Sequence, residues 1–288
     1  MTYCVGLRLD RGIIFASDTR TNAGFDNVAT FSKMHVWERI GDRVVVMMTA
    51  GNLAFTQSVV SLLNEKVNLG PEHHSLGTCT TMFQAARLVG ETVRELRRSE
   101  KEIIEDNPSL FGASFILGGQ IIGERPRLFQ IYQEGNFIEA TKDTAYFQIG
   151  EHKYGKPILD RVAKPDMRMG VAAKLILISF DSTLRSNLSV GMPIDLLIYR
   201  KDELKVGEQR RIEERDPYFR KISAGWSQAL RNAFAHIDEY GEEPKADAGT
   251  IVSPFASEPA GDQSSGEQPS GDKRPAQATA GWLNEVDA

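Results

Sequence analysis

The residue of this chain best placed to do chemistry is Thr2, which becomes the first residue once Met1 is removed. Methionine removal is favoured when the next side chain is small, so a Met-Thr start exposes a threonine with a free α-amine. If Thr2 opens a strand, its hydroxyl and amine lie within reach of each other, and one residue supplies nucleophile and base. With a reference pKa of about 7.7 to 8.0, that amine is substantially neutral near pH 7. Many proteins begin this way without chemical purpose, so the interpretation depends on other residues.

Two charged residues further along could activate such a nucleophile. A nearby fixed cation favours the alkoxide and keeps the amine deprotonated. Lys33, ahead of the apolar-rich segment MHVWERI, is the candidate cation. A lysine in a partly buried cleft needs a carboxylate partner to stay charged, and Asp18, at the end of an expected strand, is the candidate partner. Taken singly, Asp18 is a turn residue and Lys33 is a surface charge.

Gly51 is the candidate for stabilising an oxyanion. The tetrahedral intermediate of acyl transfer needs backbone N–H donors. Gly51 lies between the segment RVVVMMTA and an expected helix, which places its N–H group at a helix N-terminus. Alone, it would be a strand-to-helix turn. The combination of Thr2, Lys33, Asp18 and Gly51 predicts an acyl-transfer site.

Strand-like segments must position these residues. Four segments in the first 50 residues are rich in apolar and β-branched residues and predict two hairpins, YCVGLRL with GIIFASD and KMHVWERI with RVVVMMTA. A later block predicts an antiparallel meander forming a second sheet, from SFILGGQII, RLFQIYQ, NFIEATK and AYFQIG. Two further strands are expected at IDLLIYR and ELKVGEQRRIE.

Helical periodicity separates the strand blocks. Apolar residues three and four positions apart predict helices around residues 55–62 and 82–96, and again at 152–163 and 169–187. Residues 217–237 predict a last helix that closes the core with one stripe, formed by Ile222, Trp226, Leu230 and Phe234. Two sheets with one apolar face each, between two helix pairs, predict an α+β fold with four α/β/β/α layers.

The composition favours one large domain followed by a tail. The 288 residues are 41 % hydrophobic, enough for an ample core. Residues 241–288 hold nine acidic against three basic residues and many Pro, Gly and Ser, which predicts a disordered acidic tail after a domain of residues 1–240. The rest of the chain is then almost neutral and shows no basic stripe. A nucleic-acid partner is therefore not expected.

Other classes of protein have little support. No stretch reaches the roughly 18 apolar residues of a membrane helix, and the start lacks a secretory pattern, so the chain is expected in the cytoplasm. Cys4 and Cys79 are expected to be buried free thiols. The pair His73 and His74 is expected in a solvated loop, and no metal or cofactor is expected. Without a phosphate-binding G-x-x-x-x-G-K-[ST] loop, any unfolding ATPase must be a separate protein.

The ordered motifs resemble the proteasome β-subunits, a group of N-terminal nucleophile hydrolases. The chain reads DTRTNAG at 18–24, SKMH at 32–35 and TAGN at 49–52. Thr2 and Asp18 are 16 positions apart, as in the family. The spacing from Asp18 to Lys33 is one residue shorter, which a loop deletion explains. Similarity covers residues 1 to about 215, and the lack of a propeptide with a longer last helix and tail is similar to the bacterial ancestral β-subunits (Anbu).

The resemblance implies the four-layer fold, a nucleophile at Thr2 and one retained serine, Ser189. It also exposes departures from the family. Glu151 stands where the family has a serine that supports the amine, and Ser186 stands where it has an aspartate. We therefore expect proton transfer to be slow, to depend on Glu151 as a substitute, or to require assembly.

The same resemblance implies a substrate groove. A peptide would add as an extended strand between the segment with Asn22 and residues 51–53, which implies broad specificity. Five residues are expected to line a medium, mostly apolar pocket for the side chain before the scissile bond, namely Thr21, Phe31, His35, Thr49 and Leu53. Core packing is an equal alternative for Phe31 and Leu53.

Three functions remain open from the sequence. The first is a threonine peptidase that cleaves peptides or unfolded proteins through an ester on Thr2, inside a homo-oligomer. Apolar helix faces would drive its assembly into rings of six or seven or an open spiral. The second is an N-terminal nucleophile amidase acting on a small amide or modified peptide. The third is a catalytically silent scaffold that has kept the fold and the assembly surfaces.

Overall fold

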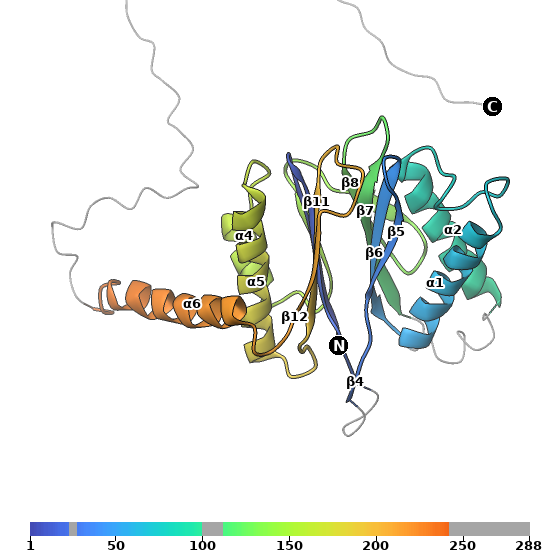
Figure 1. Cartoon of the computed structure of the whole chain (residues 1–288). Coiled ribbons are helices and arrows are strands. Elements are labelled where there is room, and N and C mark those ends of the chain that lie inside the picture. Colours follow the sequence, from blue (N-terminus) through green and yellow to red (C-terminus); the bar gives the residue numbers. More distant parts are fainter. Residues whose placement is uncertain (23–27, 100–111, 242–288) are drawn as a thin grey trace, which may run out of the picture. The chain divides into compact units, whose positions relative to one another are not determined.

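Two antiparallel sheets face each other at the centre of the fold (Figure 1). The computed structural model describes residues 1–22, 28–99 and 112–241, of which residues 1–237 form one unit. Apart from its first residue, Gly241, the expected tail at 241–288 lies outside the described residues.

The first sheet holds the chain's opening strand between two other strands. Its order is β10-β1-β2-β11-β12 and every neighbouring pair is antiparallel. The strands are β1 (Tyr3–Leu9), β2 (Gly12–Asp18), β10 (Tyr146–Gly150), β11 (Ile194–Arg200) and β12 (Glu208–Ile212). Because β1 lies between β2 and β10, both neighbours hold the backbone that follows Thr2.

The second sheet has the order β5-β6-β7-β8-β9, again antiparallel throughout. Its strands are β5 (Met34–Arg39), β6 (Arg43–Gly51), β7 (Ala113–Ile121), β8 (Arg127–Ile131) and β9 (Phe137–Glu139). A short hairpin, β3 (Arg20–Asn22) with β4 (Val28–Thr30), connects the two sheets. Strand β6 therefore ends at Gly51 on the second sheet, facing the start of β1 on the first.

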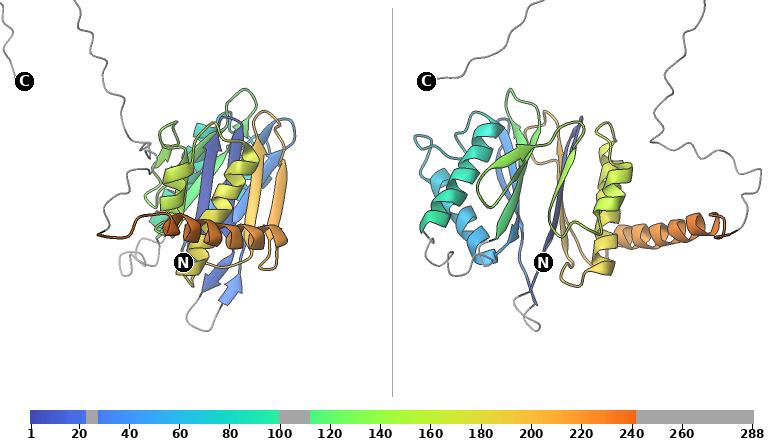
Figure 2. Two further views of the ribbon diagram at one scale, coloured as in Figure 1. Left: turned by 90° about the vertical axis from the view of Figure 1, so that its left-hand side faces the viewer. Right: turned by 180° about the vertical axis from the view of Figure 1, so that it is seen from behind.

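Helices cover the outer face of each sheet (Figures 1 and 2). Helices α1 (Leu53–Asn68) and α2 (Met82–Ser99) pack on the second sheet, and α4 (Lys156–Val162) and α5 (Met169–Ser186) pack on the first. The last helix is α6 (Pro217–Ala235). The expected α+β architecture with four α/β/β/α layers is thus confirmed.

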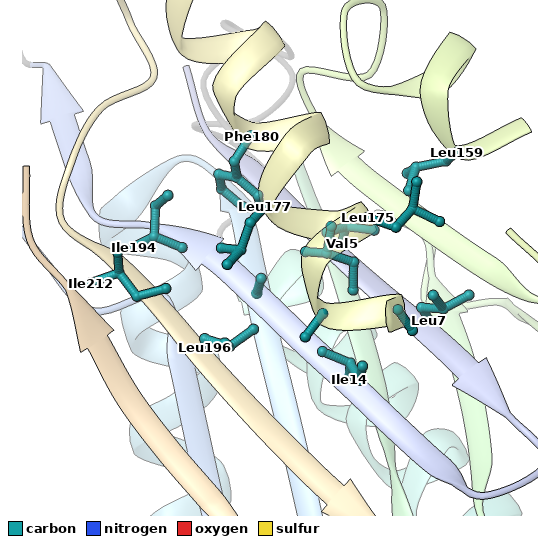
Figure 3. Close-up of a cluster of buried hydrophobic side chains, with 14 of the residues drawn as sticks. Val5, Leu7, Ile14, Leu159, Leu175, Leu177, Phe180, Ile194, Leu196 and Ile212 are labelled. Atoms are coloured by element: carbon teal, nitrogen blue, oxygen red, sulfur yellow. The ribbon is translucent and has the colours of Figure 1, made fainter. Parts of the chain in front are cut away.

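Three buried apolar clusters hold the layers together, one in each interface between them. Figure 3 shows the cluster between the first sheet and α5, where Val5 and Leu7 of β1 meet Leu175 and Phe180. Alternate residues of β1 face the helices, so Cys4 points into the cluster between the sheets. By the same alternation, Thr2 lies on the side of β1 that faces the second sheet.

The assignment of strands to sheets differs from the sequence expectation. We expected one sheet from the first four strands and another from the later block. Instead the second hairpin, β5-β6, pairs with β7, while β10 leaves the meander and pairs with β1. Strand patterns show that a segment has a buried face but not which strand it pairs with. The hairpin β3-β4 was also missed, and the last strand begins at Glu208 rather than at residue 203.

The expectation that the last helix closes the core along its whole stripe is wrong. In α6 only Phe219 and Ile222 are buried, while Leu230 is 51 % and Phe234 is 79 % exposed. The helix has 19 residues and is about 28 Å long, and Figure 1 shows its second half extending away from α5. The stripe is real, but its second half, Leu230 and Phe234, stays exposed among the described residues of this unit.

Candidate active site

The turn after β10 holds the backbone of Thr2. The carbonyl oxygen of Thr2 accepts a hydrogen bond from the N–H group of Glu151 at 2.6 Å. Gly150, with a φ of +82°, makes this approach possible, because a Cβ there would lie 2.1 Å from that oxygen. Glycine adopts this left-handed backbone without strain. The local sequence Gly150-Glu151 therefore fixes where the chain's start lies.

Tyr3 anchors the same strand from the helical side. Its hydroxyl hydrogen-bonds to the hydroxyl of Ser179 on α5 at 3.0 Å and accepts a hydrogen bond from the amide of Gln148 at 2.8 Å. The ring is fully buried and packs against Phe180, with 4.5 Å between the ring centroids. A buried polar group with both partners satisfied resists displacement. Tyr3 thus keeps Thr2 on the side that faces the second sheet.

Asp18 and Lys33 form a buried ion pair next to the start of β1. The Lys33 Nζ donates to Asp18 Oδ1 at 2.6 Å, and the side chains are 5 % and 0 % exposed. Asp18 also accepts hydrogen bonds from the N–H groups of Tyr3 at 2.9 Å and Gly191 at 3.4 Å. Burial raises the pKa of Asp18, and the Lys33 ammonium and these N–H donors oppose the rise. Lys33 also donates to the carbonyl oxygen of Arg20 at 2.7 Å.

The ion pair influences the terminal amine. Burial and the nearby Lys33 charge lower the pKa of the α-amine of Met1, and Asp18 partly opposes them. A cation raises the free energy of a neighbouring ammonium group and so favours the neutral amine. An amine placed against Lys33 is therefore a stronger candidate for a general base than one in open solvent.

Gly51 ends β6 beside the first turn of α1. Its φ is +114°, and a Cβ there would lie 2.0 Å from the carbonyl oxygen of Gly112, so the position requires glycine. Asn52 caps the helix by accepting a hydrogen bond from the N–H group of Phe55 at 2.9 Å. Gly51 is thus next to the positive end of a helix dipole, as the sequence suggested.

A cavity of about 230 Å³ lies beside the start of β1. Thr2, Lys33 and Gly51 line it together with three of the expected pocket residues, Thr21, Thr49 and Leu53. Arg20 and Thr56, which were not expected from the sequence, also line it. Phe31, which is 39 % exposed, and His35 lie outside the lining. The side chain of Asn22 lies outside the described part of the chain.

The segment after α5 contains the remaining candidates. Ser189 is half-buried, and its N–H group donates to Asn187 Oδ1 at 2.9 Å. Ser186 is exposed, whereas Glu151 is buried and accepts a hydrogen bond from the Asn187 amide at 2.7 Å. Asn187 was not singled out from the sequence, because its bond to Glu151 joins residues 36 positions apart.

The described residues contain neither a metal-binding cluster nor a helix that could span a membrane. In residues 1–22, 28–99 and 112–241, no group of three or more His, Cys, Asp or Glu side chains is arranged to hold a metal ion. No helix of those ranges is long and apolar enough to cross a membrane.

Four layers with the opening strand inside a central sheet are the architecture of the N-terminal nucleophile hydrolases. The chain belongs to the proteasome subunit family, whose model matches residues 2–198. It is a proteasome-type β-subunit close to the Anbu subunits. A search of curated proteins found no match.

Solved structures of Anbu subunits from three bacteria are similar to this chain. A Gly-1 mutant from Hyphomicrobium sp. strain MC1 is 59 % identical, with a TM-score of 0.78, over 83 % of this chain and 99 % of that one. The subunit from Yersinia bercovieri is 51 % identical, with a TM-score of 0.77, over 82 % and 98 % of the two chains. The Anbu complex from Pseudomonas aeruginosa, solved as a helical assembly, is 45 % identical, with a TM-score of 0.78, over 85 % and 100 %.

Proposed function

We propose that this subunit is a threonine peptidase that uses Thr2, after loss of Met1, to hydrolyse peptide bonds. The observation that carries the proposal is the buried Asp18–Lys33 pair, whose lysine lines the same cavity as Thr2 and Gly51. A buried ion pair contributes little net stability compared with apolar residues of the same size. Its place beside a hydroxyl, a terminal amine and a helix N-terminus is accounted for by catalysis.

The mechanism needs only groups of this chain and one water molecule. The Thr2 amine takes the hydroxyl proton while Oγ1 attacks the scissile carbonyl carbon, and the Gly51 N–H group stabilises the oxyanion. The amine then passes the proton to the leaving nitrogen, the C–N bond breaks and an ester on Thr2 remains. The amine next takes a proton from water, whose oxygen attacks the ester carbon. The carboxylic acid leaves, and Thr2 regains its hydroxyl.

Intact mass measured before and after treatment with a peptide epoxyketone tests the proposal. This probe reacts with both the hydroxyl and the amine of an N-terminal threonine. We expect a mass that lacks Met1 and gains one adduct, located on Thr2 by peptide mapping. Retained Met1, or a processed and assembled subunit without adduct, would refute the peptidase and leave the silent scaffold.

The cavity size favours an amidase for small amides as the second candidate. About 230 Å³ accommodates one substrate side chain, which a small amide or modified amino acid also supplies. The two candidates differ in how the rate depends on substrate length. An increase in kcat/KM from a one-residue amide to a four-residue peptide supports the peptidase, because extended peptides add main-chain hydrogen bonds. A constant or falling value supports the amidase.

The pH dependence of hydrolysis is expected to report the Thr2 amine. Because the neutral amine is the base, kcat/KM should rise with pH through the amine pKa. Burial and the Lys33 charge lower the pKa of the Met1 amine, and Lys33 lines the same cavity as Thr2. We therefore expect the rising limb of the Thr2 enzyme below the reference range of about 7.7 to 8.0. Removing the cation in Lys33→Met should move the residual limb to higher pH. A limb that stays unchanged in this variant would contradict the assignment of Lys33.

Homo-oligomeric assembly forms part of the proposal. Three apolar side chains at the C-terminal end of α6 are exposed. They are Leu230 (51 %) and Phe234 (79 %) in the helix, and Ile237 (71 %) directly after its C-cap. The first half of α6 lines an apolar groove of about 480 Å³ together with α4 and α5. Exposed apolar surface of this kind marks a contact site. A second copy of the chain is the occupant we propose, in keeping with the helical assembly of the Pseudomonas aeruginosa complex.

Leu230→Glu with Phe234→Glu is expected to shift the subunit toward monomers. Two charges would have to be buried at the contact between copies, which strongly disfavours association. The measurement is the mass of the assembly in solution by light scattering. Asn232→Glu is the matched control, because this exposed residue lies on the same helix but off the apolar stripe. An unchanged assembly in the double variant would exclude α6 from the interface.

A further inference from the structure

Two loops far apart in the sequence hold the candidate catalytic groups. The turn after β10 binds the carbonyl oxygen of Thr2 through the Glu151 N–H group. The loop after α5 binds Asp18 through the Gly191 N–H group. If one loop moves against the other, the nucleophile moves relative to its activating ion pair. A contact between these loops therefore decides the geometry of the site.

That contact is a partly buried bridge between Glu151 and Asn187. The side chain of Glu151 is buried, and one carboxylate oxygen accepts hydrogen bonds from the N–H groups of His152 at 2.9 Å and Lys153 at 2.8 Å. The other oxygen accepts from Asn187 Nδ2 at 2.7 Å. Asn187 Oδ1 in turn accepts from the Ser189 N–H group at 2.9 Å.

The bridge has a fixed polarity. Asn187 must point its nitrogen at the carboxylate and its oxygen at the Ser189 N–H group, because the reverse orientation leaves two mismatched pairs. Burial opposes ionisation of Glu151, but the Lys153 N–H group, the Asn187 amide and the His152 N–H group outweigh it and lower its pKa. The bridge is therefore a charge-assisted hydrogen bond, which is stronger than a neutral one.

We propose that the Glu151–Asn187 bridge positions Thr2 against Asp18 and Lys33, and that it replaces the serine and aspartate which the family places on these two loops. Both residues act through the backbone that they fix and are positioning residues. This inference rests on the proposed threonine chemistry. It adds two specific residues, and their hydrogen-bond polarity, to the requirements for that chemistry.

Swapping the polarity of the bridge tests the inference. In Glu151→Gln the new amide nitrogen faces Asn187 Nδ2, so two donors oppose each other. In Asn187→Asp two carboxylates face each other, which is also repulsive. In the double variant, the introduced glutamine can keep the backbone bonds and donate to the introduced aspartate, which can still accept from the Ser189 N–H group. All the hydrogen bonds are then restored with the charge on the opposite loop.

We expect each single variant to lower the rate of epoxyketone adduct formation about 10²-fold, as a displacement of about 1 Å does in an active site. For peptide hydrolysis the loss should lie in kcat rather than in KM. The double variant should react at least about 10-fold faster than either single variant. Glu139→Gln is the control, with an unchanged rate, because this carboxylate on β9 of the second sheet pairs with Arg125 and Arg127 and not with either loop. Single variants at the wild-type rate, or a double variant no faster than the singles, would overturn the inference.

Crystal structures of the four proteins give a second readout that does not depend on activity. We expect the distance from Thr2 Oγ1 to Lys33 Nζ to change in both single variants and to return to the wild-type value in the double variant. An unchanged distance in the singles would overturn the inference even if the wild type forms no adduct. A wild type without adduct but with the expected shifts would instead refute the proposed peptidase and keep the positioning role.

Discussion

Thr2→Ala is expected to abolish adduct formation and to lower peptide hydrolysis by at least about 10⁴-fold, the loss typical of removing a catalytic nucleophile. Alanine keeps a small second residue, so Met1 is still removed and the amine is still present. The variant loses the hydroxyl and one methyl group from the cavity that Lys33 and Gly51 line. The measurements are kcat/KM for a fluorogenic peptide and intact mass after epoxyketone treatment.

Thr2→Ser is the matched control for this prediction. Serine keeps the hydroxyl next to the amine and lacks only the methyl group, so it should still form the adduct and hydrolyse peptide. Both variants should assemble and melt like the wild type, because Thr2 contributes backbone rather than side-chain hydrogen bonds to the described structure. Hydrolysis by Thr2→Ala at more than a tenth of the wild-type rate would mean that another residue is the nucleophile.

Lys33→Met is expected to cause the second large loss, of about 10³-fold or more in kcat/KM, because the fixed cation beside the nucleophile disappears. It should also destabilise the fold by about 3–5 kcal/mol at neutral pH, the cost of leaving one partner of a buried ion pair alone. Asp18, with no exposed side-chain surface, then has no cation to offset its burial. Chemical denaturation and peptide kinetics measure the two effects separately.

The stability loss in Lys33→Met should depend on pH in a defined direction. Burial already raises the pKa of Asp18, and losing the ammonium raises it further. A carboxyl group whose pKa is higher in the folded than in the unfolded chain binds its proton more tightly when folded. The destabilisation is therefore complete above the folded-state pKa of Asp18, and it shrinks as the pH falls through that pKa toward the unfolded value.

The double variant Asp18→Asn with Lys33→Met separates stability from catalysis. The introduced asparagine can still accept the hydrogen bond from the Tyr3 N–H group and carries no charge, so most of the lost stability should return. Hydrolysis should not return, since the cation is still absent. Recovery of activity together with stability would show that Lys33 acts only by supporting the fold.

The sequence predicted much of the site because four of its candidate groups lie within the first 51 residues. Thr2, Asp18, Lys33 and Gly51 are each marked by residue type and by their place at the end or start of a strand. In the structure Thr2, Lys33 and Gly51 line one cavity, and Asp18 forms an ion pair with Lys33. Strand and helix patterns also predicted the layers, because periodicity reports which face of an element is buried.

Pairings between distant segments were decided only by the tertiary structure. The bridge from Glu151 to Asn187 joins the ends of β10 and α5, and no local pattern marks an asparagine as the partner of a carboxylate elsewhere in the chain. The exchange of β10 into the first sheet has the same cause, since an alternating strand pattern fits either sheet.

The sequence by itself thus determined the elements, the apolar faces and the chemically competent residue types. Local backbone preferences and side-chain polarity fix these features within a few positions of the chain. Only the tertiary structure decided which strands pair, that Arg20 and Thr56 line the cavity while Phe31 does not, and that Leu230 and Phe234 stay exposed. These features depend on the packing of segments far apart in the chain, where a stripe or a charge has several possible partners and the fold selects one.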